Sequence, residues 1–89
     1  MDHTDIASQT HRYITDNFLY ARPDFRLGND DRLLEKGVID SMGVMELVAF
    51  LQERFAIVVA EEEIVEEHFG SITAIAAYVV VKRDGTRRG

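Results

Sequence analysis

The stretch that decides the fold runs from residue 37 to residue 48 and reads Gly-Val-Ile-Asp-Ser-Met-Gly-Val-Met-Glu-Leu-Val. A polar loop that contains glycine precedes it, and apolar residues recur at helical spacing after it. We therefore predict an amphipathic helix over about 41–54. Asp40 or Ser41 stands at the N-cap position, where short polar side chains are preferred. Ser41 is expected to be exposed at the mouth of this helix.

The two faces of this predicted helix differ in character. The inward face is expected to be an apolar stripe, with Val48 at its edge, formed by Leu47, Phe50, Leu51 and Phe55. The opposite face mixes acidic and flexible apolar residues, namely Met42, Met45, Glu46, Ala49 and Glu53. Because methionine adapts to several partners, we interpret this face as a docking surface. The alternative is that the two methionines pack beneath the preceding loop.

A first helix is predicted over about 4–19, with Thr4 or Asp5 as its N-cap. It ends before Pro23, because proline disfavours helix in the residue that precedes it. Residues 20–40 then form a long connection with a short helical turn at about 31–36. Unstructured connections of that length are uncommon in compact domains. We therefore expect it to be pinned to the core by Phe25, Leu27, Leu33 and Leu34.

Two more helices are predicted after residue 60. Residues 61–69 form a short acidic helix, whose carboxylates we interpret as a solvated, partner-facing surface. Gly70 ends it, and Ser71 caps a last helix that extends to about Lys82. The buried stripe of that helix is expected to be Ile72, Ile75, Ala76, Val79 and Val80. The expected fold is all-α, a small four-helix bundle over residues 1–83, followed by a flexible C-terminal tail over 84–89.

The composition indicates one small globular domain. The chain has 89 residues, of which 46% are hydrophobic and 29% are charged. It has no cysteine, which excludes a disulfide framework, a thiolate metal site and a cysteine nucleophile. We find no apolar run typical of a signal peptide or a membrane span. A soluble, monomeric, cytoplasmic protein is therefore expected.

The net charge of −6 is unevenly distributed. Residues 27–70 contain eleven acidic and three basic residues, a net charge of −8, whereas residues 82–88 carry +3. This acidic body argues against nucleic-acid binding, which needs a basic footprint. It favours protein partners with basic patches, which it would attract by electrostatic steering. The alternative is that the acidic residues only keep a small protein soluble.

Catalysis and metal binding find little support in the sequence. A serine hydrolase needs a base on the serine and a third group that orients the base. His3, His11 and His68 have no motif spacing to Ser41. The acidic run lacks the glycine and alternating aspartates of a calcium-binding EF-hand loop. We therefore expect neither an enzyme nor a metal protein.

Covalent modification of Ser41 is the better-supported chemistry. A serine at a helix N-terminus is accessible to a modifying enzyme, and the free N–H groups and dipole of the helix favour a phosphodiester there. The adjacent Asp40 carboxylate opposes a second anion unless the modifying enzyme brings a divalent metal or basic residues. On residue type alone, a simple N-cap is the commoner role for such a serine.

Residues 37–42, followed by Glu46-Leu47-Val48 and Phe55, closely resemble the phosphopantetheine attachment motif of acyl carrier proteins. That family also includes peptidyl and aminoacyl carriers. The resemblance covers about residues 4–83 and includes the order of the helices, their spacing, the acidity and the pattern of residues 71–78. It implies a four-helix bundle of the acyl-carrier type.

The resemblance also implies a function. Ser41 would receive 4′-phosphopantetheine from coenzyme A through a magnesium-dependent phosphopantetheinyl transferase. Asp40 would help this transferase to recognise the site. The thiol of this arm would carry acyl or aminoacyl groups as thioesters between enzymes, without catalysis by the carrier. The expected partners are an activating ligase or synthase and acyltransferases. They would dock on the face formed by Met42, Met45, Glu46 and Glu53.

Three residues depart from the family pattern. Met42 replaces the leucine that usually follows the serine, Gly43 stands where another acid is frequent, and Ala60 replaces a frequent proline. The chain is more similar to free-standing carriers of specialised pathways, including the D-alanyl and aminoacyl carriers served by adenylate-forming ligases. Two alternatives are an unmodified helical adaptor that binds through its acidic face and a small serine hydrolase.

Overall fold

The computed structural model describes residues 2–88, and the side chains of residues 2–85. Regular structure in this range is all helical, which confirms the predicted fold class. A long connection follows the first helix, and the third helix is short, as predicted. The elements are α1 (His3–Phe18), α2 (Ser41–Phe55), the 3-10 turn η1 (Glu61–Glu63), α3 (Glu66–Phe69) and α4 (Ile72–Arg88).

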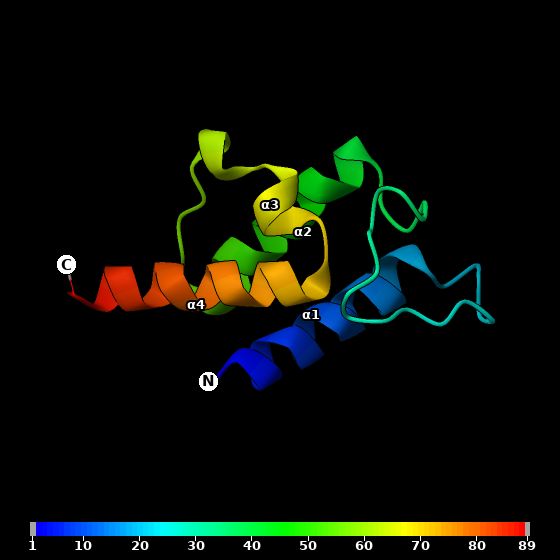
Figure 1. Cartoon of the computed structure of the whole chain (residues 1–89), viewed down its shortest axis with the longest axis horizontal. Helices are drawn as coiled ribbons and strands as arrows, with labels where there is room; N and C mark the ends of the chain where they lie inside the picture. Colours follow the sequence, from blue (N-terminus) through cyan, green and yellow to red (C-terminus); the bar gives the residue numbers. More distant parts are fainter. Residues whose placement is uncertain (1, 89) are drawn as a thin grey trace.

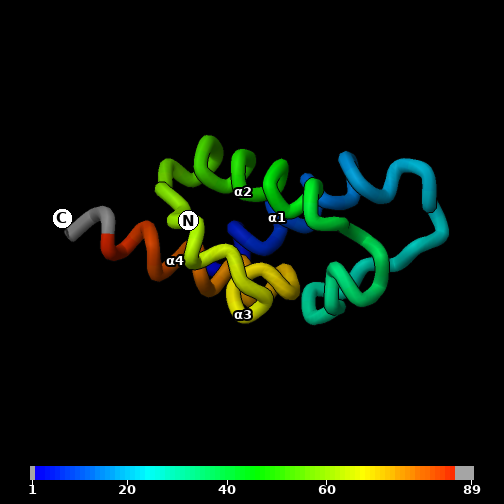
Figure 2. The backbone as a smooth tube through the Cα atoms, turned by 90° about the horizontal axis from the view of Figure 1, so that it is seen from above, coloured from blue at the N-terminus to red at the C-terminus, as the bar shows by residue number. Residues whose placement is uncertain are grey.

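The helices form a bundle that measures 43 × 25 × 20 Å. α4 is the central packing element, since it contacts α1, α2 and α3. Seen from above, α2 runs along one side of the bundle and α4 with α3 along the other (Figure 2). α1 lies beneath them, and the 19–40 connection occupies the end of the molecule opposite the C-terminus (Figure 1).

The core contains one contiguous cluster of apolar side chains from every helix. The predicted stripe of α2 is confirmed for Leu47, Leu51 and Phe55. Phe50 is only half-buried, and its ring stacks on that of Tyr13 with 4.0 Å between the centroids. On α4 the predicted stripe is fully buried except for Val80, which is partly buried.

The long connection is anchored where α3 meets α4. The Leu33 N–H donates to the Gly70 carbonyl at 2.9 Å, and the Thr73 N–H donates to the Asn29 carbonyl at 3.0 Å. The Leu33 side chain is fully buried, as predicted. Leu34 was predicted to be an anchor as well, but its side chain is 45% exposed. It occupies the turn over 33–37, where neighbouring side chains point in different directions.

Three predicted helix boundaries or caps are wrong. The N-cap of α1 is Asp2, whose carboxylate accepts the Asp5 N–H at 2.9 Å, so neither Thr4 nor Asp5 caps it. The predicted acidic helix over 61–69 is two short elements, η1 and α3, because Val65 between them is extended. α4 continues to Arg88, past its predicted end at about Lys82. The predicted tail is therefore helical over 84–88, and Gly89 lies outside the described residues.

Glu63 also departs from the prediction of a fully solvated acidic surface. One of its carboxylate oxygens, Oε1, accepts hydrogen bonds from the Ala60 N–H, the Tyr78 hydroxyl and the Lys82 ammonium, each at 3.0 Å. The first of these bonds, followed by that from Lys82, lowers the pKa of Glu63. Burial, and then Glu63, raises the pKa of Tyr78 to about 12.

Gly43 occupies the tightest place in the first turn of α2. A Cβ atom there would lie 2.6 Å from Ile39 Cγ1 and 2.9 Å from Phe18 Cε1. The glycine thus allows the helix to approach both the end of α1 and the connection. This crowding explains why no acidic side chain stands at this position, one of the departures noted above.

Replacing Gly43 tests this close approach. We expect Gly43→Ala to lower the free energy of unfolding by about 1–2 kcal/mol, because overpacking costs more than the added helix propensity contributes. Gly85→Ala is the matched control, since a Cβ at this α4 position meets open space. It should raise stability by up to about 1 kcal/mol. Urea unfolding followed by circular dichroism measures both, and a gain in both variants would contradict the crowding.

Candidate functional site

Asp40 and Ser41 have different roles at the start of α2. Asp40 has an extended backbone, and its carboxylate accepts the Gly43 N–H at 2.7 Å, which makes it the N-cap. Its carbonyl accepts the Val44 N–H at 2.9 Å. Ser41 is the first residue of the helix. The alternative that Ser41 is merely the cap is therefore wrong.

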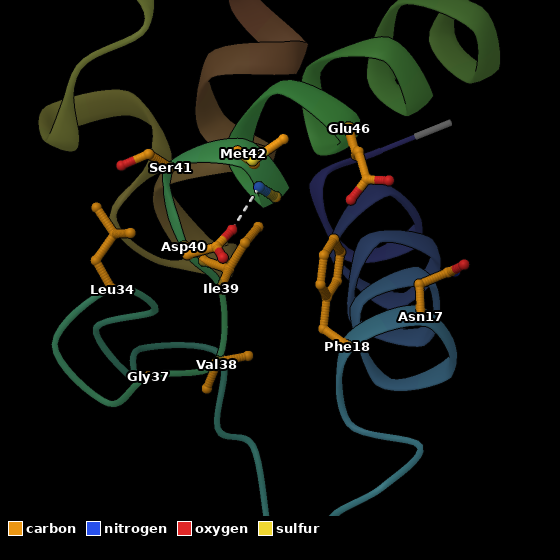
Figure 3. A pocket seen from close by; sticks show the side chains of 11 residues that line it. Asn17, Phe18, Leu34, Gly37, Val38, Ile39, Asp40, Ser41, Met42 and Glu46 are labelled. Carbon is orange, nitrogen blue, oxygen red and sulfur yellow. Dashed lines mark hydrogen bonds between the residues drawn. The ribbon is translucent and has the colours of Figure 1, made fainter.

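The Ser41 hydroxyl is available for chemistry. Ser41 is exposed, and no other residue in the described range 2–88 forms a hydrogen bond with its hydroxyl. In Figure 3 its oxygen points away from Asp40, whose carboxylate turns under the first helical turn toward the Gly43 N–H. The capping bond thus occupies the aspartate and leaves the serine oxygen directed outward.

Two hollows meet at Ser41, which lines both together with Leu34. The first is open and more polar, and lies between the end of α1, the turn over 33–37 and the start of α2 (Figure 3). Its walls include Asn17, Phe18, Gly37, Asp40 and Glu46. The second is mainly apolar, has a volume of about 220 Å³ and lies between α2 and α3. Its walls include Val44, Met45, Ile64, Val65 and Phe69.

The structure brings most of the predicted partner-binding residues close to Ser41. Met42 is 80% exposed and lines the first hollow with Glu46, whereas Met45 is 54% exposed and lines the second. The alternative that both methionines pack beneath the loop is therefore wrong. Glu53 is exposed farther along α2, where it borders a separate hollow with Phe50 and Arg54. That these residues bind partners stays a prediction.

Sequence reasoning did not identify Val44, Ile64 and Val65 as walls of the apolar hollow. Val44 lies three residues after Ser41, so helical spacing alone could have placed it on the same side of α2. Ile64 and Val65 carried no such signal, because the pattern predicted a continuous helix through them.

Glu66, at the edge of this hollow, accepts a 2.7 Å hydrogen bond from Arg32, which raises the pKa of that guanidinium.

The histidines lie against backbone carbonyls elsewhere. His3 contacts the Thr73 carbonyl, His11 the Leu27 carbonyl and His68 the Glu63 carbonyl. None of the three lines either hollow beside Ser41. Among the described residues there is also no cluster of three or more histidine or carboxylate side chains that could hold a metal ion. No helix in this range combines the length and apolarity needed to cross a membrane.

Comparison with known proteins identifies the family. A model described as "phosphopantetheine attachment site" matches residues 19–79. The chain belongs to this family. This phosphopantetheine-attachment protein is also similar to the D-alanyl carrier protein of Streptococcus suis (strain 98HAH33), with 41% identity over 51 residues. The matched segment is 57% of this chain, and the chain spans 65% of the length of that relative.

Family membership supports the predicted cofactor, covalently attached 4′-phosphopantetheine. The geometry at Ser41 fits such a group in three respects. Its hydroxyl is exposed, and two hollows lie beside it to receive an extended arm. The backbone N–H groups of Ser41 and Met42 have no acceptor in the described range, so they are available to a phosphate at the helix N-terminus. Proteins of this carrier family are typically not catalysts.

Two alanine variants separate the roles of the adjacent residues. Asp40→Ala removes the carboxylate that accepts the Gly43 N–H and should lower the free energy of unfolding by about 1 kcal/mol. Ser41→Ala removes a hydroxyl that bonds nothing in the described range, so it should change the free energy of unfolding by less than about 0.5 kcal/mol. Chemical denaturation of the unmodified protein measures both effects. Equal losses would mean that both residues cap the helix.

Proposed function

We propose that this protein is an acyl or aminoacyl carrier, and that Ser41 is the residue that bears its 4′-phosphopantetheine. The observation that supports this most is the Ser41 hydroxyl itself. It is exposed at the N-terminus of a rigid helix, and Asp40, the preceding residue, provides the cap in its place. The carrier domain would span residues 1–83, act as a monomer and catalyse no step itself.

The residues around Ser41 support this role in distinct ways. When attached, the arm ends in a thiol that holds cargo as a thioester. Ser41 Oγ supplies the attachment oxygen, and the free N–H groups of the first turn of α2 favour the phosphate. Asp40 keeps that turn in one conformation, and we propose that the phosphopantetheinyl transferase recognises it together with the serine. An uncharged Gly43 leaves fewer acidic groups beside the phosphate than an acid at this position would.

The apolar hollow supports a short cargo. Its volume of about 220 Å³ is only moderately larger than the roughly 150 Å³ cavity that accommodates a benzene ring. A short acyl group or an amino-acid side chain fits that space better than a long fatty chain. The similarity to a D-alanyl carrier protein supports the aminoacyl class, in which an adenylate-forming ligase would supply the cargo.

Partners would approach the face of α2 that bears Met42, Met45, Glu46 and Glu53. The two methionines supply exposed apolar surface close to Ser41, and the two carboxylates supply negative charge. Such a face fits a transferase, ligase or acyltransferase with basic residues around an apolar centre. A cytoplasmic location follows from this proposal, because coenzyme A and nucleotide-dependent ligases are found there.

Loading with the arm tests the proposal directly. Incubation of the protein with coenzyme A and a broad-specificity phosphopantetheinyl transferase should add one phosphopantetheine group per chain, as measured by intact-protein mass spectrometry. Ser41→Ala should abolish the mass increase. Ser8→Ala, which removes another exposed serine hydroxyl on α1, should not. An unmodified wild-type protein beside an active control carrier would refute the proposal.

Charge reversal tests the docking face. We expect Glu46→Lys and Glu53→Lys each to lower the kcat/KM of loading by about three- to tenfold at low ionic strength, because steering by opposite charges is lost. Salt should reduce the difference. Asp24→Lys makes the same change of charge in the 19–40 connection and should have a much smaller effect.

The adaptor alternative predicts a different result. For an unmodified adaptor, charge reversal on α2 would abolish partner binding, whereas Ser41→Ala would leave every partner-dependent activity intact.

A further inference from the structure

We propose that Glu63 is a positioning residue that holds one wall of the apolar hollow beside Ser41 and thereby limits the length of acyl chain that the hollow accepts. This inference rests on the proposed function, because it concerns cargo attached at Ser41. The side chains of Glu63, Tyr78 and Lys82 form what we call the Glu63 clamp.

The clamp ties the connection between α2 and α3 to the middle of α4. The Tyr78 hydroxyl and the Lys82 ammonium of the clamp donate to the single oxygen Oε1 of Glu63, which also accepts the Ala60 N–H, each at 3.0 Å. The Tyr78 side chain is buried, with 6% exposure, and the Glu63 and Lys82 side chains are 29% and 27% exposed. A charged acceptor shielded in this way forms stronger hydrogen bonds than a neutral one. These hydrogen bonds, that of the Ala60 N–H first, lower the pKa of Glu63, so this acceptor stays ionised to a lower pH than an ordinary glutamate.

The backbone of Glu63 is held as well as its side chain. Its carbonyl accepts hydrogen bonds from the Val65 N–H and from His68 Nδ1, both at 2.9 Å. The His68 ring in turn stacks on Tyr78, with 4.8 Å between the centroids and 28° between the planes. Residue 63 is thus held by hydrogen bonds from both α3 and α4.

The wall of the hollow follows directly in the chain. Ile64 and Val65 come immediately after Glu63 and line the hollow opposite Val44 and Met45 of α2. Neither residue belongs to a helix, and Val65 is 45% exposed. Two residues span at most about 7 Å of chain, so a displacement of Glu63 moves this wall. Val44 and Met45 belong to the helix α2, whereas Ile64 and Val65 lie outside regular helix, so the wall that follows Glu63 yields more readily than the wall formed by α2.

The clamp therefore keeps the hollow narrow. Loss of its hydrogen bonds frees Ile64 and Val65 to move outward, and the hollow can then admit a longer apolar chain. The clamp makes no contact with Ser41 that would affect attachment of the arm. Loading of the arm and selection by chain length are thus separate properties, which different variants can change independently.

The first test needs no cofactor. In hydrogen–deuterium exchange of the unmodified protein, Glu63→Ala should make amides over residues 57–66 exchange about five- to tenfold faster, because the Ala60 N–H loses its acceptor and the connection loses its tie to α4. Glu62→Ala is the matched control, since it removes the neighbouring, exposed carboxylate. Equal exchange in this segment for wild type and Glu63→Ala would overturn the proposal.

The second test measures cargo selection. Wild type, Glu63→Ala, Tyr78→Phe and Glu62→Ala are loaded from acyl-coenzyme A substrates of increasing length, from acetyl to octanoyl. The readouts are the Tm relative to the unacylated arm and the rate of thioester cleavage by hydroxylamine. In wild type, the increase in Tm and the slowing of thioester cleavage should both grow with chain length and then reach a limit. In Glu63→Ala they should continue to longer chains, with Tyr78→Phe intermediate and Glu62→Ala like wild type.

The possible failures are distinguishable. If wild type takes up no arm, the proposed function fails. If all variants are loaded and share one length profile, or if the wild-type profile is flat from acetyl to octanoyl, the clamp does not select cargo and this inference fails. Tyr78→Phe removes only a hydroxyl and keeps the buried ring, so it remains informative should Glu63→Ala fold poorly.

Discussion

The rest of the structure around Ser41 depends on the backbone and side chain of Leu33, which tie the 19–40 connection to the bundle. Its N–H donates to the Gly70 carbonyl at the junction of α3 and α4, and its side chain is fully buried. Its carbonyl accepts the N–H groups of Val38 and Ile39, which lead directly into Asp40. Leu33 therefore links the start of α2 to the junction of α3 and α4. The Asn29–Thr73 hydrogen bond and the Arg32–Glu66 ion pair hold the same connection against α4 and α3.

Around Ser41, the backbone of the first turn of α2 is held in place, whereas the serine hydroxyl is left without a partner in the described range. Asp40 uses its carboxylate to close the first turn of α2, and Gly43 allows that turn to pack closely on Phe18 and Ile39. The serine hydroxyl is the group that the capping arrangement leaves unused. Leu34, the neighbour of the anchoring leucine, lies with Ser41 at the border of both hollows. An arm attached there could rest in the polar hollow or deliver its end to the apolar one.

The parts of the fold that local periodicity controls could be predicted from the sequence. Leu47, Leu51 and Phe55 repeat at helical spacing, and so do the buried residues of α4, because burial of a stripe requires that spacing. The sequence predicted that either Asp40 or Ser41 is the N-cap of α2, since both residue types are favoured at that position. The exposure of Met42 and Met45 followed from the same periodicity.

What could not be predicted depends on contacts between residues far apart in the chain. Glu63 bonds to residues 15 and 19 positions later, and a sequence of adjacent glutamates carries no sign of which one turns inward. The break between η1 and α3 lies at Ile64 and Val65, whose backbone is not helical. Consequently the sequence did not identify Ile64 and Val65 as a wall of the apolar hollow.

The continuation of α4 to Arg88 places a segment of basic sequence on a helix at one end of the molecule. The basic segment 82–88 lies at one end of the 43 Å long axis, as part of a helix, and the 19–40 connection that leads into Ser41 lies toward the other (Figure 1). The segments 82–88 and 27–70 carry net charges of +3 and −8, so a basic partner surface repels the first and attracts the second. Orientations that present the acidic segment, which contains Ser41, are thereby favoured during encounter.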